Sequence, residues 1–377
     1  MLPHSAPDTT TLITGGAGFI GAHVAEELLR AGHHVRILDA MVPQVHEDAD
    51  RPEYLSDQVE LVRGDVRDPE AVRAALVGVD RVLHLAARVG VGQSMYEIAE
   101  YTSVNAFGTG VLLEALTQQR VQRLVVASSM SVYGEGLYVD AVGEPVTSAG
   151  RPRVALQAGR WEPTGSSGGT LTPVPTPETK PVALSSVYAL NKFDQERLCL
   201  LFGEAYHVPT TALRFFNVYG RYQALSNPYT GVLAIFAARL LNDRPPLLFE
   251  DGEQRRDFVH VTDVARACRL ALSHDTSAGH VVNVGSGDSI TINDIALQLG
   301  RILDKERLAP HITGKFRVGD IRHCFADIRR AKDMLGFAPL VSMDKGLADL
   351  AEWLEGRVAV DSVEAAAAAL AARGLTV

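Results

Sequence analysis

The chain has 377 residues, of which 46% are hydrophobic and 21% are charged, and its formal net charge is -9 at pH 7. This profile predicts a globular protein of one large or two closely joined domains, and the lack of a basic field argues against nucleic acid as a partner. The cysteines Cys199, Cys268 and Cys324 are odd in number and far apart, so they indicate neither a disulfide framework nor a metal-binding motif.

Short apolar runs alternate with helical periodicity along the first 217 residues. A run starting at Thr10 leads into a glycine-rich turn and then into the amphipathic segment AHVAEELLRAG. Further apolar runs occur at HVRILDA, VELVRGD, RVLHLAA, RLVVASS and TTALRFFN, separated by helix-like segments such as PEAVRAALVG and GTGVLLEALTQQ. This alternation predicts an α/β protein with a Rossmann-type, doubly wound parallel sheet.

The glycine-rich turn has three glycines at spacings of three, Gly15, Gly18 and Gly21. We expect Gly15 to make the tight turn, Gly18 to admit a pyrophosphate at the helix N-terminus, and Gly21 to let the helix pack closely. An ordinary strand-to-helix turn would also use glycine. Asp39, about twenty residues on, would bind the adenosine ribose and repel a 2'-phosphate, so the pattern predicts NAD rather than NADP.

The second half of the chain departs from this rhythm. Residues 137–181 are rich in Pro, Gly, Ser and Thr, and we expect an insertion that is either a functional lid or poorly ordered. The predicted NAD-binding domain spans residues 10–217, with 255–283 returning to it. Residues 218–254 and 284–356 are assigned to a smaller mixed α/β substrate-binding lobe, and the Ala-rich tail, 357–377, to a peripheral helix.

Tyr188 and Lys192 stand four residues apart in SVYALNKFDQERL, so a helix would place them on one face. An ammonium near a phenol lowers its pKa and yields a base for a sugar hydroxyl. Ser129 follows the apolar run RLVVA, where it could hydrogen-bond the reacting oxygen. Taken alone, the pair also fits an amphipathic surface, and the serine fits a hydroxyl-rich loop.

Six motifs occur in order: TGGAGFIG, GDVRD, HLAA, SSMSVYG, YALNK and RFFNVYG. Together they resemble the extended short-chain dehydrogenase/reductase family of nucleotide-sugar enzymes, from Thr11 to about Glu355. The resemblance implies that Tyr188 is the acid/base, that Lys192 orients the nicotinamide ribose and tunes Tyr188, and that Ser129 is their hydroxyl partner. It implies NAD binding by Gly15, Gly18, Phe19, Ile20, Gly21, Asp39, Asp65, Val66, Leu85, Ala86, Ala87, Asn105, Ser128, Tyr188, Lys192 and Phe215.

The same resemblance implies a nucleotide-diphosphate sugar as substrate. Arg256 and Arg317 align with diphosphate-binding arginines, and Asn217 aligns with a phosphate-contacting asparagine. A single arginine without these motifs would be read as a surface charge. The full set implied for the substrate is Ser129, Ser131, Tyr188, Asn217, Arg256, Arg317 and Cys324, the last at a position that tunes pocket size.

The residues after Ser129 bear on the reaction. Dehydratases of this family place an Asp-Glu pair there, whereas this chain has Met130 and Ser131. Elimination then lacks its acid and base, and the resemblance favours transient oxidation at C4 with return of the hydride to the other face, which is 4-epimerisation. The alternatives are a UDP-sugar 4-epimerase of the galactose or glucuronate type, a dTDP-4-keto-sugar reductase, and a non-catalytic NAD-sensing regulator.

Finer similarity lies in VGVGQSMYEIA, ALSNPYTGVLAIF, FEDGEQRRDFVHV and RVGDIRHCFADI, which resemble bacterial dTDP-L-rhamnose 4-epimerases and favour a dTDP-6-deoxyhexose. That branch carries a Cys-Pro-x-Cys element in its insertion, but here the segment from Glu162 to Gly169 reads EPTGSSGG. We therefore expect no metal and a looser loop.

Further expectations concern assembly and location. By resemblance the protein is a homodimer, with helices near Asn105 and Tyr188 packing as a bundle. No basic segment leads into an apolar one at the N-terminus, and no run of about 18 apolar residues occurs, so we expect a cytoplasmic protein without a membrane span.

Overall fold

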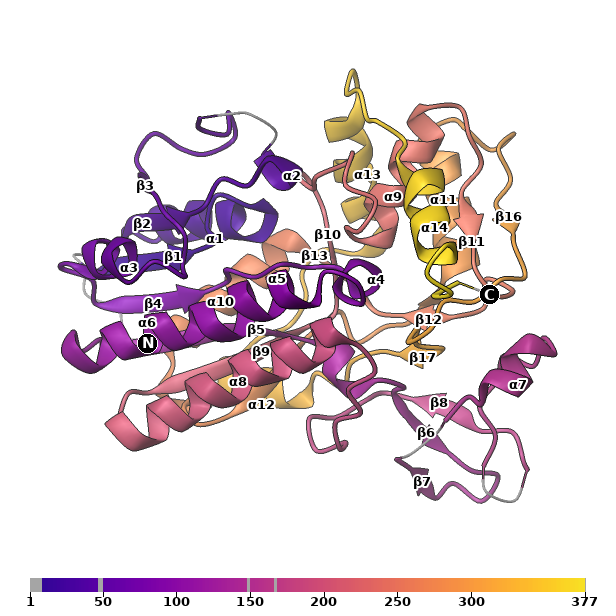
Figure 1. The fold of residues 1–377 in the computed structure, drawn as a ribbon, viewed down its shortest axis with the longest axis horizontal. Helices are drawn as coiled ribbons and strands as arrows, with labels where there is room; N and C mark the ends of the chain where they lie inside the picture. Colours follow the sequence, from indigo (N-terminus) through magenta and orange to yellow (C-terminus); the bar gives the residue numbers. More distant parts are fainter. Residues whose placement is uncertain (1–8, 47–49, 148–149, 166–167, 377) are drawn as a thin grey trace.

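The computed structural model describes residues 9–46, 50–147, 150–165 and 168–376. Within these residues, seven parallel strands form a central sheet in the order β14-β9-β5-β4-β1-β2-β3 (Figure 1). The order reverses between β1 and β4, where a doubly wound sheet opens a crevice at the carboxyl ends of its strands. The predicted fold class is confirmed. The strands are β1 (Thr10–Thr14), β2 (His34–Asp39), β3 (Glu60–Arg63), β4 (Arg81–His84), β5 (Arg123–Ser129), β9 (Thr210–Phe215) and β14 (Val281–Val284).

Helices cover both faces of this sheet (Figure 1). Successive strand residues alternate between the two cores, as Leu12 and Ile13 do in β1. Because both faces are buried, the strands occur in the sequence as unbroken apolar runs. One core is closed by α1 (Phe19–Arg30), α10 (Val261–Ser273) and α12 (Arg329–Leu335), the other by α3 (Pro69–Leu76), α6 (Gly108–Gln118) and α8 (Val187–Tyr206).

A smaller lobe has its own core, in which Leu233, Leu299 and Leu350 are buried. The chain leaves and re-enters the main sheet around this lobe, since α10 packs against α1 and β14 pairs with β9. The lobe helices are α9 (Val232–Leu241), α11 (Ile292–Ile302) and α13 (Met343–Leu354). Short pairings accompany them: β10 (Asn217–Tyr219) with β13 (Phe258–His260), β11 (Leu247–Leu248) with β16 (His311–Ile312), and β12 (Arg255–Arg256) with β15 (Ile290–Thr291) and β17 (His323–Cys324).

The insertion at 137–181 contains regular structure. Three short strands form an antiparallel sheet in the order β7-β6-β8, and a short helix lies between β7 and β8 (Figure 1). Strands of two or three residues are too short to display an alternating pattern, so they could not be predicted from the sequence. Ser166 and Ser167 of the EPTGSSGG segment lie outside the described residues. The elements are β6 (Leu137–Val139), β7 (Pro145–Val146), α7 (Arg153–Gln157) and β8 (Thr172–Val174).

The glycine turn joins β1 to α1 under tight steric limits. Gly15 has a positive φ of 68°, and Gly18 caps α1 without a side-chain hydrogen bond. A Cβ on Gly21 would lie 2.4 Å from the Cα of Gly16, so helix and turn meet at a distance that only glycine allows.

We expect Gly21→Ala to destabilise the protein by about 1 to 3 kcal/mol, because the added methyl group overpacks this contact. Gly110 is the matched control: it lies inside α6, and a Cβ there meets nothing within 4 Å. Gly110→Ala should leave stability unchanged or raise it by up to about 1 kcal/mol. Calorimetric melting of both variants tests this, and equal losses would show that the contact with Gly16 is not limiting.

Candidate active site

The glycine turn and the loop after β4 face each other across the crevice. A Cβ on Gly15 would lie 2.8 Å from the backbone nitrogen of Ala86, whereas one on Gly18 would have only the Gly15 carbonyl, at 3.5 Å, nearby. The space beside Gly18 is therefore open at the N-terminus of α1, where unpaired amides and the helix dipole favour an anion. These residues fit the pyrophosphate of a dinucleotide.

Asp39 ends β2 beside this turn and is buried. One carboxylate oxygen accepts from the Ala17 amide at 3.0 Å, the other accepts from the Met41 amide at 2.9 Å, and His46 Nε2 lies 3.4 Å away. Asp39 thus shapes the turn as well as placing a negative charge next to it. Its predicted contact with the adenosine ribose stays a prediction.

Two further predicted NAD contacts, Asp65 and Val66, follow β3. Arg67 binds the Asp65 carboxylate at 2.7 Å and lowers its pKa, and the same guanidinium reaches Glu100 at 3.1 Å. Val66 is buried, and a Cβ on Gly108 would lie 2.6 Å from it. This turn is thereby fixed against the start of α6.

Asn105 clamps the loop after β4. It is fully buried, its side-chain oxygen accepts from the Arg88 amide at 2.7 Å, and its side-chain nitrogen donates to the Arg88 carbonyl at 3.0 Å. The residue lies in a π-helical turn, Ser103–Phe107, between α5 (Ile98–Thr102) and α6. Such turns mark functional sites in many proteins. The clamp holds the segment next to Leu85, Ala86 and Ala87.

Tyr188 lies in the first turn of α8. Ser186 caps this helix by accepting from the Ala189 amide, and the Tyr188 amide donates to the Ser94 hydroxyl at 3.0 Å. Burial raises the pKa of Tyr188, while the neighbouring Ser129 hydroxyl lowers it. Ser129 ends β5, and its oxygen accepts from the Ser131 hydroxyl at 3.0 Å. Ser129 and Tyr188 are thus brought together as predicted, in a partly exposed position.

Lys192 is 3% exposed and one turn further along α8. Its Nζ donates to Oε1 of Gln195 at 2.8 Å, a partner that the sequence reasoning missed. Burial lowers the pKa of Lys192 to about 8, against smaller upward effects of Cys199 and Glu196. In this structure the group that opposes the upward pKa shift of Tyr188 is Ser129.

Ser128 belongs to a buried polar cluster that joins α8 to the sheet. Its hydroxyl donates to Glu196 at 2.7 Å, and Arg214 binds the same carboxylate through two bonds of 2.9 and 2.7 Å. All three side chains are buried, and the guanidinium also stacks on the Tyr133 ring at 4.6 Å. This cluster joins α8 to β5 and β9. Of the remaining predicted NAD contacts, Phe215 is buried, and Phe19 and Ile20 are partly exposed.

The two predicted diphosphate arginines converge on Asp320. Arg317 binds one carboxylate oxygen at 3.1 Å, and Arg256 lies 3.7 Å from the other. Arg256 is also bound to the Arg322 carbonyl at 3.0 Å. Burial alone would raise the pKa of Asp320, but Arg317, Arg256 and Arg151 lower it overall. The structure thus gathers three arginines around one aspartate, and diphosphate binding by Arg256 and Arg317 stays a prediction.

The other predicted substrate residues differ in their surroundings. Within the described part of the chain, the side-chain oxygen of Asn217 is buried and has no hydrogen-bond partner. Ser131 is 5% exposed. Cys324 is 1% exposed, its Sγ lies 3.9 Å from the Thr176 hydroxyl, and burial raises its pKa to about 12. Cys324 is therefore a packing residue rather than a nucleophile.

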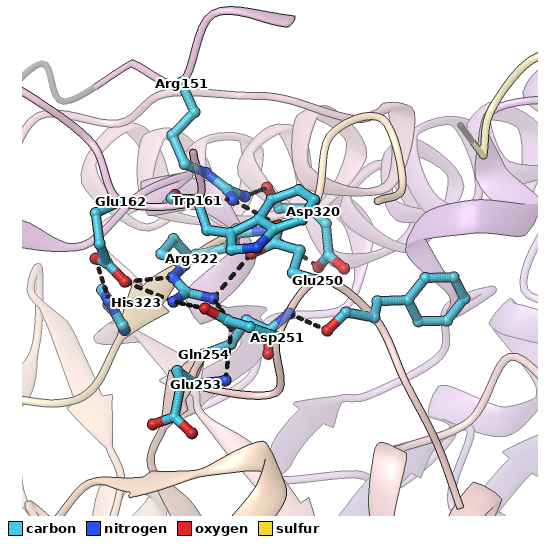
Figure 2. A network of polar contacts seen from close by, with 12 residues as sticks. Arg151, Trp161, Glu162, Glu250, Asp251, Glu253, Gln254, Asp320, Arg322 and His323 are labelled. Atoms are coloured by element: carbon cyan, nitrogen blue, oxygen red, sulfur yellow. Dashed lines mark hydrogen bonds and ion pairs between the residues drawn. The ribbon is translucent and has the colours of Figure 1, made fainter. Parts of the chain in front are cut away.

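An ion-pair cluster connects the insertion to the smaller lobe (Figure 2). The guanidinium of Arg322 is 1% exposed and is enclosed by Glu162 at 2.8 Å, Asp251 at 2.6 Å and Glu250 at 3.0 Å. Glu162 also contacts His323 at 2.9 Å. The glutamate that begins the EPTGSSGG segment thus anchors this end of the insertion by charge.

Arg151 is a second tie from the insertion (Figure 2). It binds Glu135 at 2.8 Å and Glu250 at 2.5 Å, and it donates to the Asp320 carbonyl at 2.8 Å. The insertion is therefore linked to the residue on which Arg256 and Arg317 converge. Neither arginine tie was predicted from the sequence.

The tail contacts both lobes. Its helix α14 (Val363–Ala371) brings Leu370 against Gly92 of α4 (Val91–Ser94), and Arg373 stacks on Tyr96 at 4.4 Å. The Leu375 carbonyl then accepts from the Val318 amide at 2.9 Å, next to Arg317. The Ala-rich composition predicted the helix but not its place.

Known proteins resemble this chain in sequence and in fold. The sequence profile of the NAD dependent epimerase/dehydratase family matches residues 11–155 and 162–285. A dTDP-L-rhamnose 4-epimerase from Burkholderia thailandensis is 36% identical over 350 residues, covering 91% of this chain and 94% of that protein. A UDP-glucose 4-epimerase structure from Thermotoga maritima, with UDP-glucose, has a TM-score of 0.74 at 29% identity and covers 92% of this chain and 99% of its own.

A UDP-glucose 4-epimerase from Thermus thermophilus, in complex with NAD, has a TM-score of 0.73 at 29% identity, covering 93% of this chain and 100% of its own. The chain belongs to the NAD-dependent epimerase/dehydratase family, and NAD is its cofactor. No helix in the described residues is both long and apolar enough to cross a membrane.

We expect Glu162→Gln to loosen the insertion while leaving the main sheet intact. Hydrogen bonds from His323 and Arg322 overcome the effect of burial and lower the pKa of Glu162 from 4.5 to about 2. The anchor is therefore fully present above pH 4.5 and is lost as the pH falls toward 2. Hydrogen exchange at neutral pH should increase in residues 150–165 of the variant. Glu144→Gln, an exposed change in the same insertion, is the control, and equal exchange in both would contradict the anchor.

Proposed function

We propose that the chain is a 4-epimerase of a dTDP-6-deoxyhexose, with dTDP-L-rhamnose the favoured substrate. Several of its relatives are nucleotide-sugar 4-epimerases, and the proposal adds the sugar and the base. The relative from Burkholderia thailandensis supports this choice because the similarity extends over nearly all of both chains.

The observation that carries the epimerase assignment is the environment of Ser129 and Tyr188. Met130 is 8% exposed and packs in an apolar cluster with Tyr133 and Phe216. Ser131 donates its hydroxyl to Ser129. The two positions directly after Ser129 hold no carboxylate, so a 4-keto sugar formed here would not meet the Asp-Glu pair that dehydratases place there to eliminate water.

The chain's own residues account for the proton steps. Bound NAD would supply the hydride acceptor and later the hydride donor, held by the glycine turn and the loop after β4. Tyr188 takes the proton of the C4 hydroxyl, and Ser129 hydrogen-bonds the same oxygen. Lys192 stabilises the phenolate by its charge. After the 4-keto sugar has rotated, Tyr188 returns the proton and the opposite configuration results.

The smaller lobe would hold the part of the substrate that does not react. Arg256 and Arg317 would release Asp320 and bind the diphosphate instead, because both guanidinium groups pair with an anion in either state. A firmly held diphosphate lets the sugar turn without leaving the site. Cys324 would contribute a compact side chain near this part of the substrate.

A UDP-sugar is the second candidate, because the Thermotoga maritima enzyme holds UDP-glucose on a closely similar fold. Incubation with dTDP-L-rhamnose or UDP-galactose, without added reductant, separates the candidates. We expect the 4-epimer of dTDP-L-rhamnose, detected by NMR, with no net change in NADH absorbance. Product from UDP-galactose alone would overturn the choice of substrate, and a requirement for NADH would indicate a reductase.

Tyr188→Phe should lower kcat by roughly 100- to 10,000-fold, because general acid-base catalysis contributes that much. Tyr206→Phe is the matched control, since Tyr206 lies on the same helix and is 49% exposed. Both variants should bind NAD like the parent, as measured by calorimetric titration. Full turnover by Tyr188→Phe would revive the idea of a non-catalytic protein that only senses NAD.

We also propose a homodimer built on α8 and the neighbouring π-helical turn. Leu190, Leu198 and Leu201 expose apolar side chains on one side of α8, and Phe107 is 58% exposed next to it. Contiguous apolar groups on paired helices are typical of an interface.

Leu201→Glu should convert the dimer to a monomer, because a charge at the centre of an apolar interface is left unpaired. Leu340→Glu is the control at an exposed leucine elsewhere. Light scattering coupled to gel filtration measures the mass of both variants. A parent protein that is monomeric at micromolar concentration would contradict the proposal.

A further inference from the structure

We propose that Gln195 is a positioning residue for the reaction: it holds the Lys192 ammonium in place with a neutral oxygen and so keeps the positive charge available to Tyr188. This proposal rests on the proposed function, in which Tyr188 and Lys192 carry the proton chemistry.

Gln195 lies three residues after Lys192 on α8 and is fully buried. Its Oε1 accepts from Lys192 Nζ at 2.8 Å. Its Nε2 lies 3.1 Å from the Ala86 carbonyl, 3.0 Å from the Thr109 hydroxyl and 3.1 Å from Nε2 of His84. Because the carbonyl and the hydroxyl can both accept, the orientation of the amide follows from its surroundings, with the oxygen toward Lys192.

The Gln195 amide is itself held by a series of buried hydrogen bonds that starts at Thr14, next to the glycine turn. His84, which ends β4, lies 2.7 Å from the Thr14 hydroxyl through Nδ1 and 2.9 Å from the Thr109 hydroxyl through Nε2. Burial lowers the pKa of His84 to about 3, so the ring is neutral. With the ring proton on Nε2, Thr14 donates to Nδ1, while His84 and Gln195 both donate to Thr109, which donates to the Asn105 carbonyl at 2.6 Å. With the ring proton on Nδ1, Nε2 accepts from Gln195 instead.

This series of hydrogen bonds sets the position of Lys192 relative to the NAD-binding residues. Thr14 directly precedes Gly15, and its hydroxyl accepts from the Ala86 amide at 3.2 Å. Gln195 holds the carbonyl of the same Ala86. The lysine, the glycine turn and the loop after β4 are therefore joined by hydrogen bonds rather than by packing alone, which is how supporting residues fix catalytic geometry.

The charges around Lys192 show why a neutral partner matters. Glu196 on the same helix is already bound by Arg214 of β9 and by Ser128 of β5. Burial raises the pKa of Cys199 to about 12, so it is a neutral thiol, and His84 of β4 is neutral as well. No anion pairs with the ammonium among the described residues. Gln195 takes one of the three N–H groups of Lys192, which leaves two for ligand hydroxyls.

The test compares two substitutions in the NAD-bound enzyme. Gln195→Met keeps the length and removes the oxygen, so kcat should fall roughly 10- to 100-fold through misplacement of Lys192, while KM changes by less than about threefold. Gln195→Glu keeps the oxygen and adds a charge. Its kcat at neutral pH should fall because the ion pair with Lys192 weakens the positive field at Tyr188.

The pH profile distinguishes positioning from general damage. In the parent, Lys192 is charged below about pH 8, so activity should decline above that pH. In Gln195→Glu the carboxylate raises the pKa of Lys192, and the alkaline limb should move to higher pH. The ionisation of Tyr188, followed by ultraviolet tyrosinate absorbance against Tyr188→Phe, should also move upward, and this readout needs no substrate.

Thr211→Val is the control for loss of a buried hydrogen bond, because the Thr211 hydroxyl is fully buried and bonds Ser277 far from Lys192. Its melting temperature should fall without a change in pH profile. Parental kcat and pH profile in Gln195→Met would overturn the proposal, as would losses that match Thr211→Val. Full activity in Tyr188→Phe would instead overturn the proposed function, whatever the Gln195 variants do.

Discussion

The site depends on how α8 is fixed to the sheet. The buried ion pair of Glu196 with Arg214, supported by Ser128, joins this helix to β5 and β9. A buried pair contributes little net stability, because desolvation offsets the attraction, but it strongly disfavours any other arrangement that leaves a charge unpaired. A small rotation of α8 would break the pair. It would also move Tyr188 and Lys192 away from the crevice, so the ion pair sets the register of both groups.

This arrangement explains why the sequence could predict the sheet but not the network. The strands are buried on both faces, so their apolar runs and the glycine turn were visible, and the predicted topology was confirmed. On α8, however, the partly exposed Tyr188 and the buried Lys192 are followed by the buried Gln195 and Glu196, and every buried side chain between Ala189 and Cys199 is polar. A helix with polar residues at these spacings reads as solvent-exposed. Only the family resemblance singled out the first two, and nothing local marked Gln195.

Contacts between distant segments escaped prediction for the same reason. Arg256 and Arg317 were identified by their motifs, but the approach of Arg256 to Asp320 and the Arg322 cluster join residues that are far apart in sequence and leave no periodic pattern. The π-helical turn around Asn105 adds one residue to a helical repeat, and this shift interrupts the periodic pattern by which a helix is predicted. The insertion strands are simply too short. Each omission is a long-range or a very short feature.

The two ends of the proposed site differ in kind. Around Lys192 the network is neutral apart from the lysine, with a glutamine, a neutral histidine and two threonines fully buried. Around Asp320 it is ionic, and partly exposed groups such as Glu162 and Arg317 take part. The proposed epimerase needs both. The positive charge of Lys192 must stay unpaired near the proton transfer, and the diphosphate must stay tightly bound while the keto sugar rotates. Salt screens partly exposed ion pairs far more than buried neutral hydrogen bonds. Ionic strength should therefore act on substrate affinity through the insertion and the arginines, whereas pH acts on turnover through Tyr188 and Lys192.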